Sequence, residues 1–173
     1  GGAVVRSYEI NSDGSFNKDS MKAYISDVQY GGTQASPVIY NDRLYLGGGG
    51  GVMGSNEPFH VIDANTMEEI YRIDEILTKG TPILTTAYTT KENNQEVYLY
   101  IVPYAPDRES NSSVMYIVRD SIGQTEPRYE KVTNVGDWQF STQSMAISPD
   151  GNMVFYNDAK ILYCYGNRND TRI

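Results

Sequence analysis

Short apolar and aromatic runs, each bounded by turn residues, cover almost the whole chain. Runs of this length that end at Gly, Asn, Asp or Pro predict β-strands, because a helix needs a longer stretch with a period of about 3.6 residues. A weak helical periodicity is found in one short segment, 18–25. The pattern therefore predicts an all-β chain. The clearest strand runs are 43–47, 97–102 and 153–156, and they follow the turn residues Asn41-Asp42, Asn93-Asn94 and Pro149-Asp150-Gly151-Asn152.

The other apolar segments fit around these runs in a regular order. One short segment precedes each run and one or two follow it, so the strands group into units of up to four. The first apolar run, 4–10, with its turn at 11–15, has the character of a third strand. First strands are predicted at 38–40, 83–85 and 145–147, third strands at 59–63, 114–118 and 161–165, and fourth strands at 69–73 and 128–132.

A Thr-led motif precedes the first strand of each unit. Its copies begin at Thr33, Thr78 and Thr142, so the intervals are 45 and 64 residues. Repetition at about 40–50 residues per four-stranded unit is typical of β-propellers. The copies read Thr33-Gln34-Ala35-Ser36-Pro37, Thr78-Lys79-Gly80-Thr81-Pro82 and Thr142-Gln143-Ser144-Met145-Ala146.

The expected fold is a partial or half β-propeller of four-stranded antiparallel blades, with about three and a half blades present. Such a part of a ring has two open sheet edges, which invite pairing with another chain. Either two copies pair edge to edge as a homodimer, or a longer chain supplies the missing blades. Within the single segment 1–173 we expect the outer strands of a first blade at 1–32, a second blade at 33–77, a third at 78–135 and an incomplete fourth at 136–173.

Composition narrows the classes of partner. The chain has 173 residues, of which 39% are hydrophobic, and fifteen tyrosines, which favour half-buried pleated surfaces. A net charge of −8 argues against nucleic acid and against an anionic membrane surface. No apolar run is long enough for a membrane helix, so no membrane insertion is expected. The lone Cys164 excludes an internal disulfide and a Cys-cluster metal site, and its apolar neighbours predict a buried thiol.

The segment 61–71, which reads Val-Ile-Asp-Ala-Asn-Thr-Met-Glu-Glu-Ile-Tyr, resembles the blade signature of quinoprotein-like (PQQ-like) β-propellers. The match is best over 34–73 and looser in the other repeats. It implies that Asp63 and Thr66 hold the turn after the third strand, and that Tyr71 occupies the place of the family's tryptophan, which wedges between blades. Two departures are Tyr71 for Trp and Met67 for the usual Gly.

The amino-acid sequence of the motif is also similar to propeller regions in large surface proteins of Gram-positive gut bacteria. That resemblance implies an extracellular or cell-wall-associated scaffold or adhesion module, which binds protein or glycan without catalysing a reaction and without a cofactor. The alternative is an enzyme, either a glycan-active hydrolase or a degenerate PQQ-dependent dehydrogenase. The dehydrogenase needs calcium, a catalytic Asp and often a vicinal disulfide, and the single cysteine excludes that disulfide.

The repeated motif supplies the candidate ligand-binding residues. Because the motif begins the innermost strands, its polar side chains are expected at the channel mouth, where they could bind a small polar ligand such as a sugar. The competing interpretation is that they only hydrogen-bond successive blades, as buried polar groups must. The candidates are Thr33, Gln34, Lys79, Thr142 and Gln143.

Other chemistry-bearing residues form no recognisable constellation. His60 is the only histidine, so a His-based triad or metal site would depend on it alone, and a structural or exposed strand histidine is expected instead. The run Gly47–Gly51 lacks the Lys and Ser/Thr of a phosphate loop, and is expected to allow close backbone approach. The carboxylate pairs Asp13/Asp27 and Asp107/Glu109 lack calcium-loop spacing, and the loop tyrosines Tyr30 and Tyr104 could anchor a sugar or protein.

Overall fold

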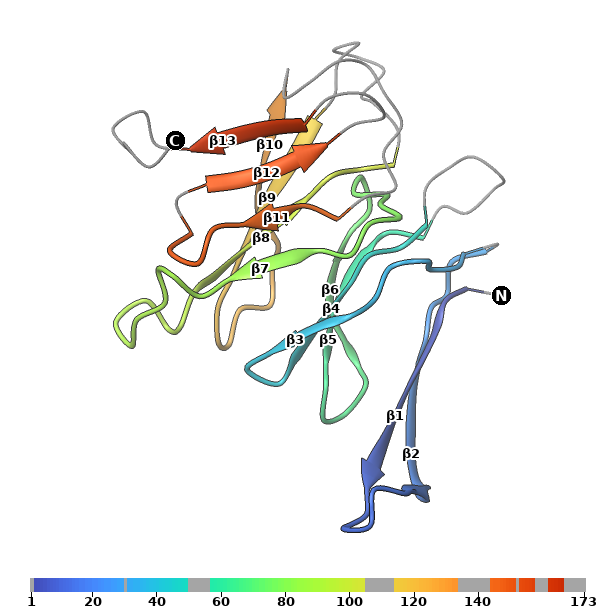
Figure 1. Cartoon of the computed structure of the whole chain (residues 1–173). Coiled ribbons are helices and arrows are strands. Elements are labelled where there is room, and N and C mark those ends of the chain that lie inside the picture. Colours follow the sequence, from blue (N-terminus) through green and yellow to red (C-terminus); the bar gives the residue numbers. More distant parts are fainter. Residues whose placement is uncertain are drawn as a thin grey trace.

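The computed structural model is all-β, and no helix occurs in the part of the chain that it describes. The described residues are 2–29, 31–49, 57–104, 114–133, 144–151, 153–157 and 162–166. Their thirteen strands form four antiparallel sheets, which follow one another along the chain (Figure 1). The series of sheets does not close on itself. An all-β chain, as the apolar pattern predicts, is thus confirmed.

Each sheet is a simple meander of strands that are consecutive in the sequence. Every strand pairs with the strand next to it along the chain, so no crossover is needed. The first sheet is a hairpin of β1 (Val4–Ile10) and β2 (Phe16–Ile25); the second contains β3 (Val38–Tyr40), β4 (Arg43–Leu46), β5 (Phe59–Asp63) and β6 (Glu69–Ile73); the third contains β7 (Ile83–Thr85), β8 (Val97–Ile101), β9 (Val114–Asp120) and β10 (Arg128–Thr133); the fourth contains β11 (Ala146–Ile147), β12 (Met153–Asn157) and β13 (Leu162–Gly166).

The strand predictions agree with these bounds to within one or two residues, and the weak helical segment does not. Residues 18–25 belong to β2, which pairs antiparallel with β1. Tyr24 is buried while its neighbours Ala23 and Ile25 are exposed, which is the alternation of a strand that packs one face on another sheet. Pairing with β1 satisfies the backbone groups that a helix of eight residues could not satisfy cooperatively.

Turn residues fix the register of the hairpins within the sheets. Asn41 and Asp42 connect β3 to β4 with φ of 50° and 57°, so both lie in the left-handed region that a tight two-residue hairpin requires. Asn tolerates this conformation better than most residues because its side chain bonds locally. The resulting register pairs Tyr40 with Arg43 and Val38 with Tyr45.

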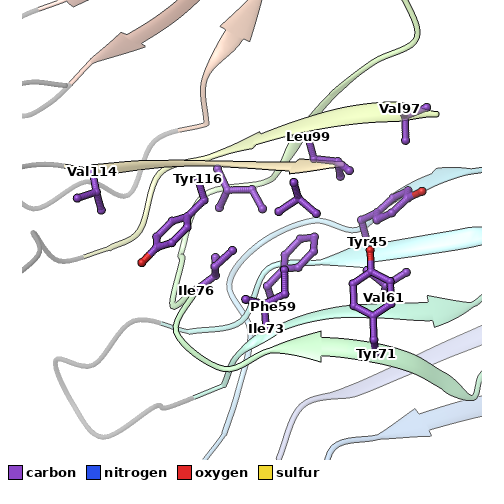
Figure 2. Packing of buried hydrophobic residues seen from close by; sticks show 12 residues of the cluster. Tyr45, Phe59, Val61, Tyr71, Ile73, Ile76, Val97, Leu99, Val114 and Tyr116 are labelled. Atoms are coloured by element: carbon purple, nitrogen blue, oxygen red, sulfur yellow. The ribbon is translucent and has the colours of Figure 1, made fainter. Parts of the chain in front are cut away.

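The central core lies between the second and third sheets. Side chains of β4, β5 and β6 face those of β8 and β9, and the cluster is almost free of solvent contact (Figure 2). Face-to-face packing of two pleated sheets takes every second residue of a strand into one core, as in β8, whereas β4 is buried at all four positions because both of its faces are covered. The buried members are Tyr45, Phe59, Val61, Tyr71, Ile73, Ile76, Val97, Leu99, Ile101, Val114, Tyr116 and Val118.

The same face-to-face arrangement joins the other sheets. The hairpin packs Tyr24 and Val5 against Leu44, Leu46 and Ile62 on the second sheet. The fourth sheet packs against the opposite face of the third. That cluster contains Val102, Met115 and Met145, with Ile83, Tyr100, Ile117, Val132, Ile147, Tyr163 and Tyr165 around it. Each inner sheet is therefore apolar on both faces.

The turn after β5 has the hydrogen bonds that the sequence predicts. The Asp63 carboxylate accepts from the backbone N–H groups of Asn65 and Thr66 at 2.8 and 2.9 Å, and the Thr66 hydroxyl accepts from the Glu68 N–H at 3.3 Å. Met67 has a φ of 62°, where glycine is the usual residue. Its side chain is buried against the cluster under the hairpin, so burial offsets the backbone strain of about 1 kcal/mol.

We expect Phe59→Ala to lower the free energy of unfolding by about 3–5 kcal/mol, because the ring is fully buried at the centre of the main core. Phe16→Ala is the matched control, since Phe16 is 64% exposed on the hairpin and should cost less than about 1 kcal/mol. Urea denaturation followed by tyrosine fluorescence measures both. Equal losses would mean that the main core does not lie between the second and third sheets.

Candidate functional site

The motif threonines Thr33 and Thr78 each link the first strand of their sheet to the second strand of the same sheet. Thr33 Oγ1 donates to the Gly47 carbonyl at 2.5 Å and accepts from the Ala35 N–H at 3.1 Å. Thr78 repeats this arrangement: it donates to the Val102 carbonyl at 2.6 Å and accepts from the Gly80 N–H at 3.1 Å. The two carbonyls lie just after the second strand of each sheet. Both hydroxyls are therefore occupied in holding the start of the first strand to the end of the second.

A second hydroxyl, three residues further on, joins neighbouring sheets. The Ser36 N–H donates to Thr81 Oγ1 at 3.0 Å, and the Thr81 N–H donates to Ser144 Oγ at 2.9 Å. The bonded residues are 45 and 63 positions apart. We call this series the hydroxyl latch. It puts Ser144, rather than a residue aligned on Thr142, in register with Ser36 and Thr81.

The remaining motif candidates have different surroundings. Gln34 is exposed. Lys79 is half-buried, with its ammonium 3.9 Å from the centre of the Tyr104 ring, a favourable cation–π arrangement. Thr142 and Gln143 lie outside the described residues. The structure thus brings Lys79 together with the predicted loop tyrosine Tyr104, while Thr33 serves the backbone; Tyr30, the other loop tyrosine, is also outside the described residues.

The glycine run allows close backbone approach where it is described. A Cβ on Gly48 would lie 1.8 Å from the Glu57 carbonyl oxygen, and one on Gly47 would lie 2.9 Å from Thr78 Cγ2 of the next sheet. Neither position can accept a side chain without movement of the backbone or of the neighbouring sheet. The expectation of close approach is confirmed for these two glycines.

A buried carboxylate, Asp120, joins the second and third sheets. It accepts from Arg43 Nε at 2.5 Å and from a terminal nitrogen of the same guanidinium at 2.9 Å. The hydroxyls of Tyr45 and Tyr71 donate to it at 2.7 and 3.0 Å. Tyr71 thus reaches from the second sheet to the third, in the place where the sequence predicts a side chain between sheets. Burial, with the nearby Asp120 charge as the second cause, raises the pKa of both tyrosines far above its usual range.

A second buried cluster surrounds His60 and joins the hairpin to the second sheet. His60 is fully buried, with Nε2 2.7 Å from Glu57 Oε1 and Nδ1 2.7 Å from Glu69 Oε2. Tyr24 of β2 donates to the same Glu69 oxygen at 2.5 Å, and Glu57 Oε2 accepts from the Ala3 N–H at 2.9 Å. Both ring nitrogens therefore lie within hydrogen-bond distance of a carboxylate oxygen, inside the contact between the hairpin and the second sheet. His60 is a structural histidine.

Other titratable side chains are engaged locally. Asp13 accepts from the backbone and hydroxyl of Ser15 in the hairpin turn, whereas Asp27 pairs with Arg72 at 2.7 Å, so the two carboxylates do not form one site. Asp107 and Glu109 lie outside the described residues. Cys164 is exposed, so the expectation of a buried thiol is wrong; it occupies the outer face of β13, while Tyr163 packs inward. In the described ranges, no group of three His, Cys, Asp or Glu residues is arranged to hold a metal ion.

The hydroxyls of the repeated motif are expected to differ in their effect on stability. Thr78→Val should lower the free energy of unfolding by about 1–3 kcal/mol, because it leaves a buried N–H and a buried carbonyl without their partner. Thr81→Val removes a half-exposed acceptor of the hydroxyl latch and should cost about 1 kcal/mol. Urea denaturation of both variants tests the order, and a smaller loss for Thr78→Val would contradict it.

Stability is expected to fall above pH 10. The buried Tyr45 and Tyr71 resist ionisation in the folded chain, so their folded pKa values are raised, and the unfolded chain alone releases these protons as the pH rises past 10. Each should remove about 1 kcal/mol of unfolding free energy between pH 10 and 11. Urea titrations at both pH values should show a decrease that is smaller by about that amount in Tyr71→Phe. An equal decrease in both proteins would refute the assignment.

Within the described ranges the chain forms no helix of the length and apolarity that crossing a membrane requires. No family model, curated protein or solved structure matches the chain.

Proposed function

We propose that the chain is a non-enzymatic scaffold or adhesion module of the β-propeller type, which acts at an extracellular or cell-wall surface and binds protein or glycan. The observation that carries the proposal is the use of its polar groups. The motif hydroxyls and the buried ionic clusters join strands and sheets, while Gln34 is exposed and Lys79 is half-buried against the Tyr104 ring.

The order of the sheets supports the propeller part of this proposal. Consecutive meanders pack face to face, and the hydroxyl latch links their innermost strands in the same direction from one sheet to the next. A bond that repeats between equivalent positions is what a radial series of blades needs. Completion of the ring would come from further blades, or from a second copy that pairs with an open edge.

The environments of the buried groups support a module without catalysis. Among the described residues, Glu57, His60 and Glu69 are acid and base groups that converge, and His60 contacts both carboxylates beneath the hairpin. Asp120 accepts four hydrogen bonds from the neighbouring sheet. A general acid or base must reach the substrate proton within hydrogen-bond distance. Substrate would gain such access only if sheets separated.

The binding part of the proposal centres on Lys79, Tyr104 and Gln34. Gln34 and Lys79 precede β3 and β7, the first strands of two successive sheets, and Tyr104 follows β8. A cation held on an aromatic ring offers hydrogen-bond donors and an apolar surface of the kind that suits a sugar or an acidic peptide. The negative net charge of the chain makes a cationic group at this position more selective for an acidic ligand.

Binding can be tested on an array of neutral and acidic oligosaccharides, with the products examined by mass spectrometry. We expect saturable binding without cleavage, weakened about tenfold by Lys79→Ala, which corresponds to ~1.4 kcal/mol. Lys91→Ala is the matched control, because Lys91 is exposed in the turn before β8. Cleaved sugars would overturn the non-enzymatic assignment. Equal binding by the two variants would exclude the Lys79 surface.

A further inference from the structure

The hairpin of β1 and β2 carries an exposed apolar face, and no other described part of the chain packs on it. Six of its large side chains are between 40% and 67% exposed: Val4, Tyr8, Ile10, Phe16, Met21 and Ile25. Exposed hydrophobic residues scattered singly are ordinary, whereas a contiguous group of this size marks an interaction surface. We call this group the hairpin outer face.

Five of these side chains are placed on one face by alternation along β1 and by pairing across the strands, on either side of a register shift between Ser7 and Glu9. Val4 pairs with Ile25 across the strands, and Ile10 pairs with Phe16. Tyr8 is two residues from Ile10 along β1, and its ring centre is 5.7 Å from that of Phe16. Met21 is 46% exposed and belongs to the stretch of β2, residues 18–21, where the register shifts.

The opposite face of the hairpin is already buried. Val5 and Tyr24 pack against Leu44, Leu46 and Ile62, and Lys22 Nζ reaches the Asn65 carbonyl at 2.6 Å. The hairpin is therefore apolar on both faces, which is the composition of a sheet with a neighbour on each side. Among the described residues, only the face with Val5 and Tyr24 has such a neighbour.

The other end of the series also presents an open face. Tyr163 and Tyr165 of β13 pack towards the third sheet, and the alternate residues Leu162 and Cys164 point away from it. Leu162 is 69% exposed and Cys164 is exposed. Figure 1 shows the hairpin at one end of the series of sheets and β13 at the other.

We infer that the hairpin outer face docks on the outer face of β13 of a second copy of this chain, head to tail. Inside the chain, each sheet has one face towards the preceding sheet and one face towards the following sheet. In every contact, the second kind of face of one sheet packs on the first kind of face of the next. The hairpin outer face looks towards the start, and the Leu162 face looks towards the end. A second copy thus offers the partner face that continues the established series.

The size of the hairpin outer face is compatible with such a contact. Six large side chains with this exposure give an apolar area on the order of 500 Å². Backbone and the shorter side chains of the same face bring it towards the ~800 Å² per partner of a standard interface. The contact is heterologous, so copies close into a ring when the rotation allows it and otherwise form a filament.

Light scattering across a dilution series tests the inference with three variants of the full chain. Phe16→Glu and Leu162→Glu should each abolish self-association, since each places a charge at one half of the contact. Ile122→Glu is the control, because Ile122 is 48% exposed in the turn after β9, away from both faces. A mixture of Phe16→Glu with Leu162→Glu should form a one-to-one dimer, because one intact contact remains.

The single cysteine provides a second readout. With Ile25→Cys, a short bis-maleimide should link the new thiol to Cys164 of another copy, and peptide mass spectrometry should identify that pair. Ile122→Cys should give no such link. Circular dichroism and the urea midpoint confirm that each variant is folded.

Three outcomes would overturn the inference. A wild-type chain that stays monomeric at the highest concentration lacks the contact. Self-association lost in Phe16→Glu but kept in Leu162→Glu, with links between two hairpins, would show a symmetric hairpin dimer. Self-association kept in both variants would place the contact at the open strand edges.

Discussion

The bonds between Arg43 and Asp120 fix the two central sheets against each other. Asp120 lies at the end of β9, and its carboxylate receives a bidentate guanidinium and two tyrosine hydroxyls, all from the second sheet. A buried charge with this many partners admits one register, since any slip leaves it unpaired at a cost of several kcal/mol. A well-packed apolar pair could supply as much stability, so the contribution of the cluster is the relative position of the sheets. The main core, the hydroxyl latch and the outer sheets all depend on that position.

The strands could be predicted from the sequence because their signals are local. Alternating burial, β-branched and aromatic residues, and turn residues such as Asn41 and Asp42 all act over a few positions. Segment 18–25 shows the limit of this reasoning: its weak helical periodicity is a local signal, whereas its strand conformation comes from pairing with β1. Met67 shows another limit, since tertiary burial outweighs a local preference for glycine at a positive φ.

The buried clusters could not be predicted, because their members are far apart in the sequence. Arg43 and Asp120 are 77 residues apart, and Tyr24 is 36 residues from His60. A charged residue inside an apolar strand, as at Arg43, signals that a partner exists but does not name it. The first bond of the hydroxyl latch could be predicted from the sequence, since Ser36 and Thr81 occupy the same place in two motif copies. An alignment that begins the third copy at Thr142 puts Met145, one residue after Ser144, opposite Ser36 and Thr81. The bond from Thr81 to Ser144 therefore does not follow from that alignment.

The contacts between successive sheets differ in their content of buried charged groups, and this content decides how strictly the relative position of two sheets is fixed. The joint between hairpin and second sheet contains the His60 cluster, and the central joint contains Asp120. Among the described residues, the joint between the third and fourth sheets holds no buried ion pair; it depends on the apolar cluster around Met115, the latch bond to Ser144 and a bond from the Tyr88 hydroxyl to the Gly151 carbonyl at 3.1 Å. Apolar contacts tolerate small shifts that buried ion pairs forbid. The fourth sheet can therefore adjust its tilt at the smallest cost, and it is also the sheet whose outer face a neighbouring copy would meet.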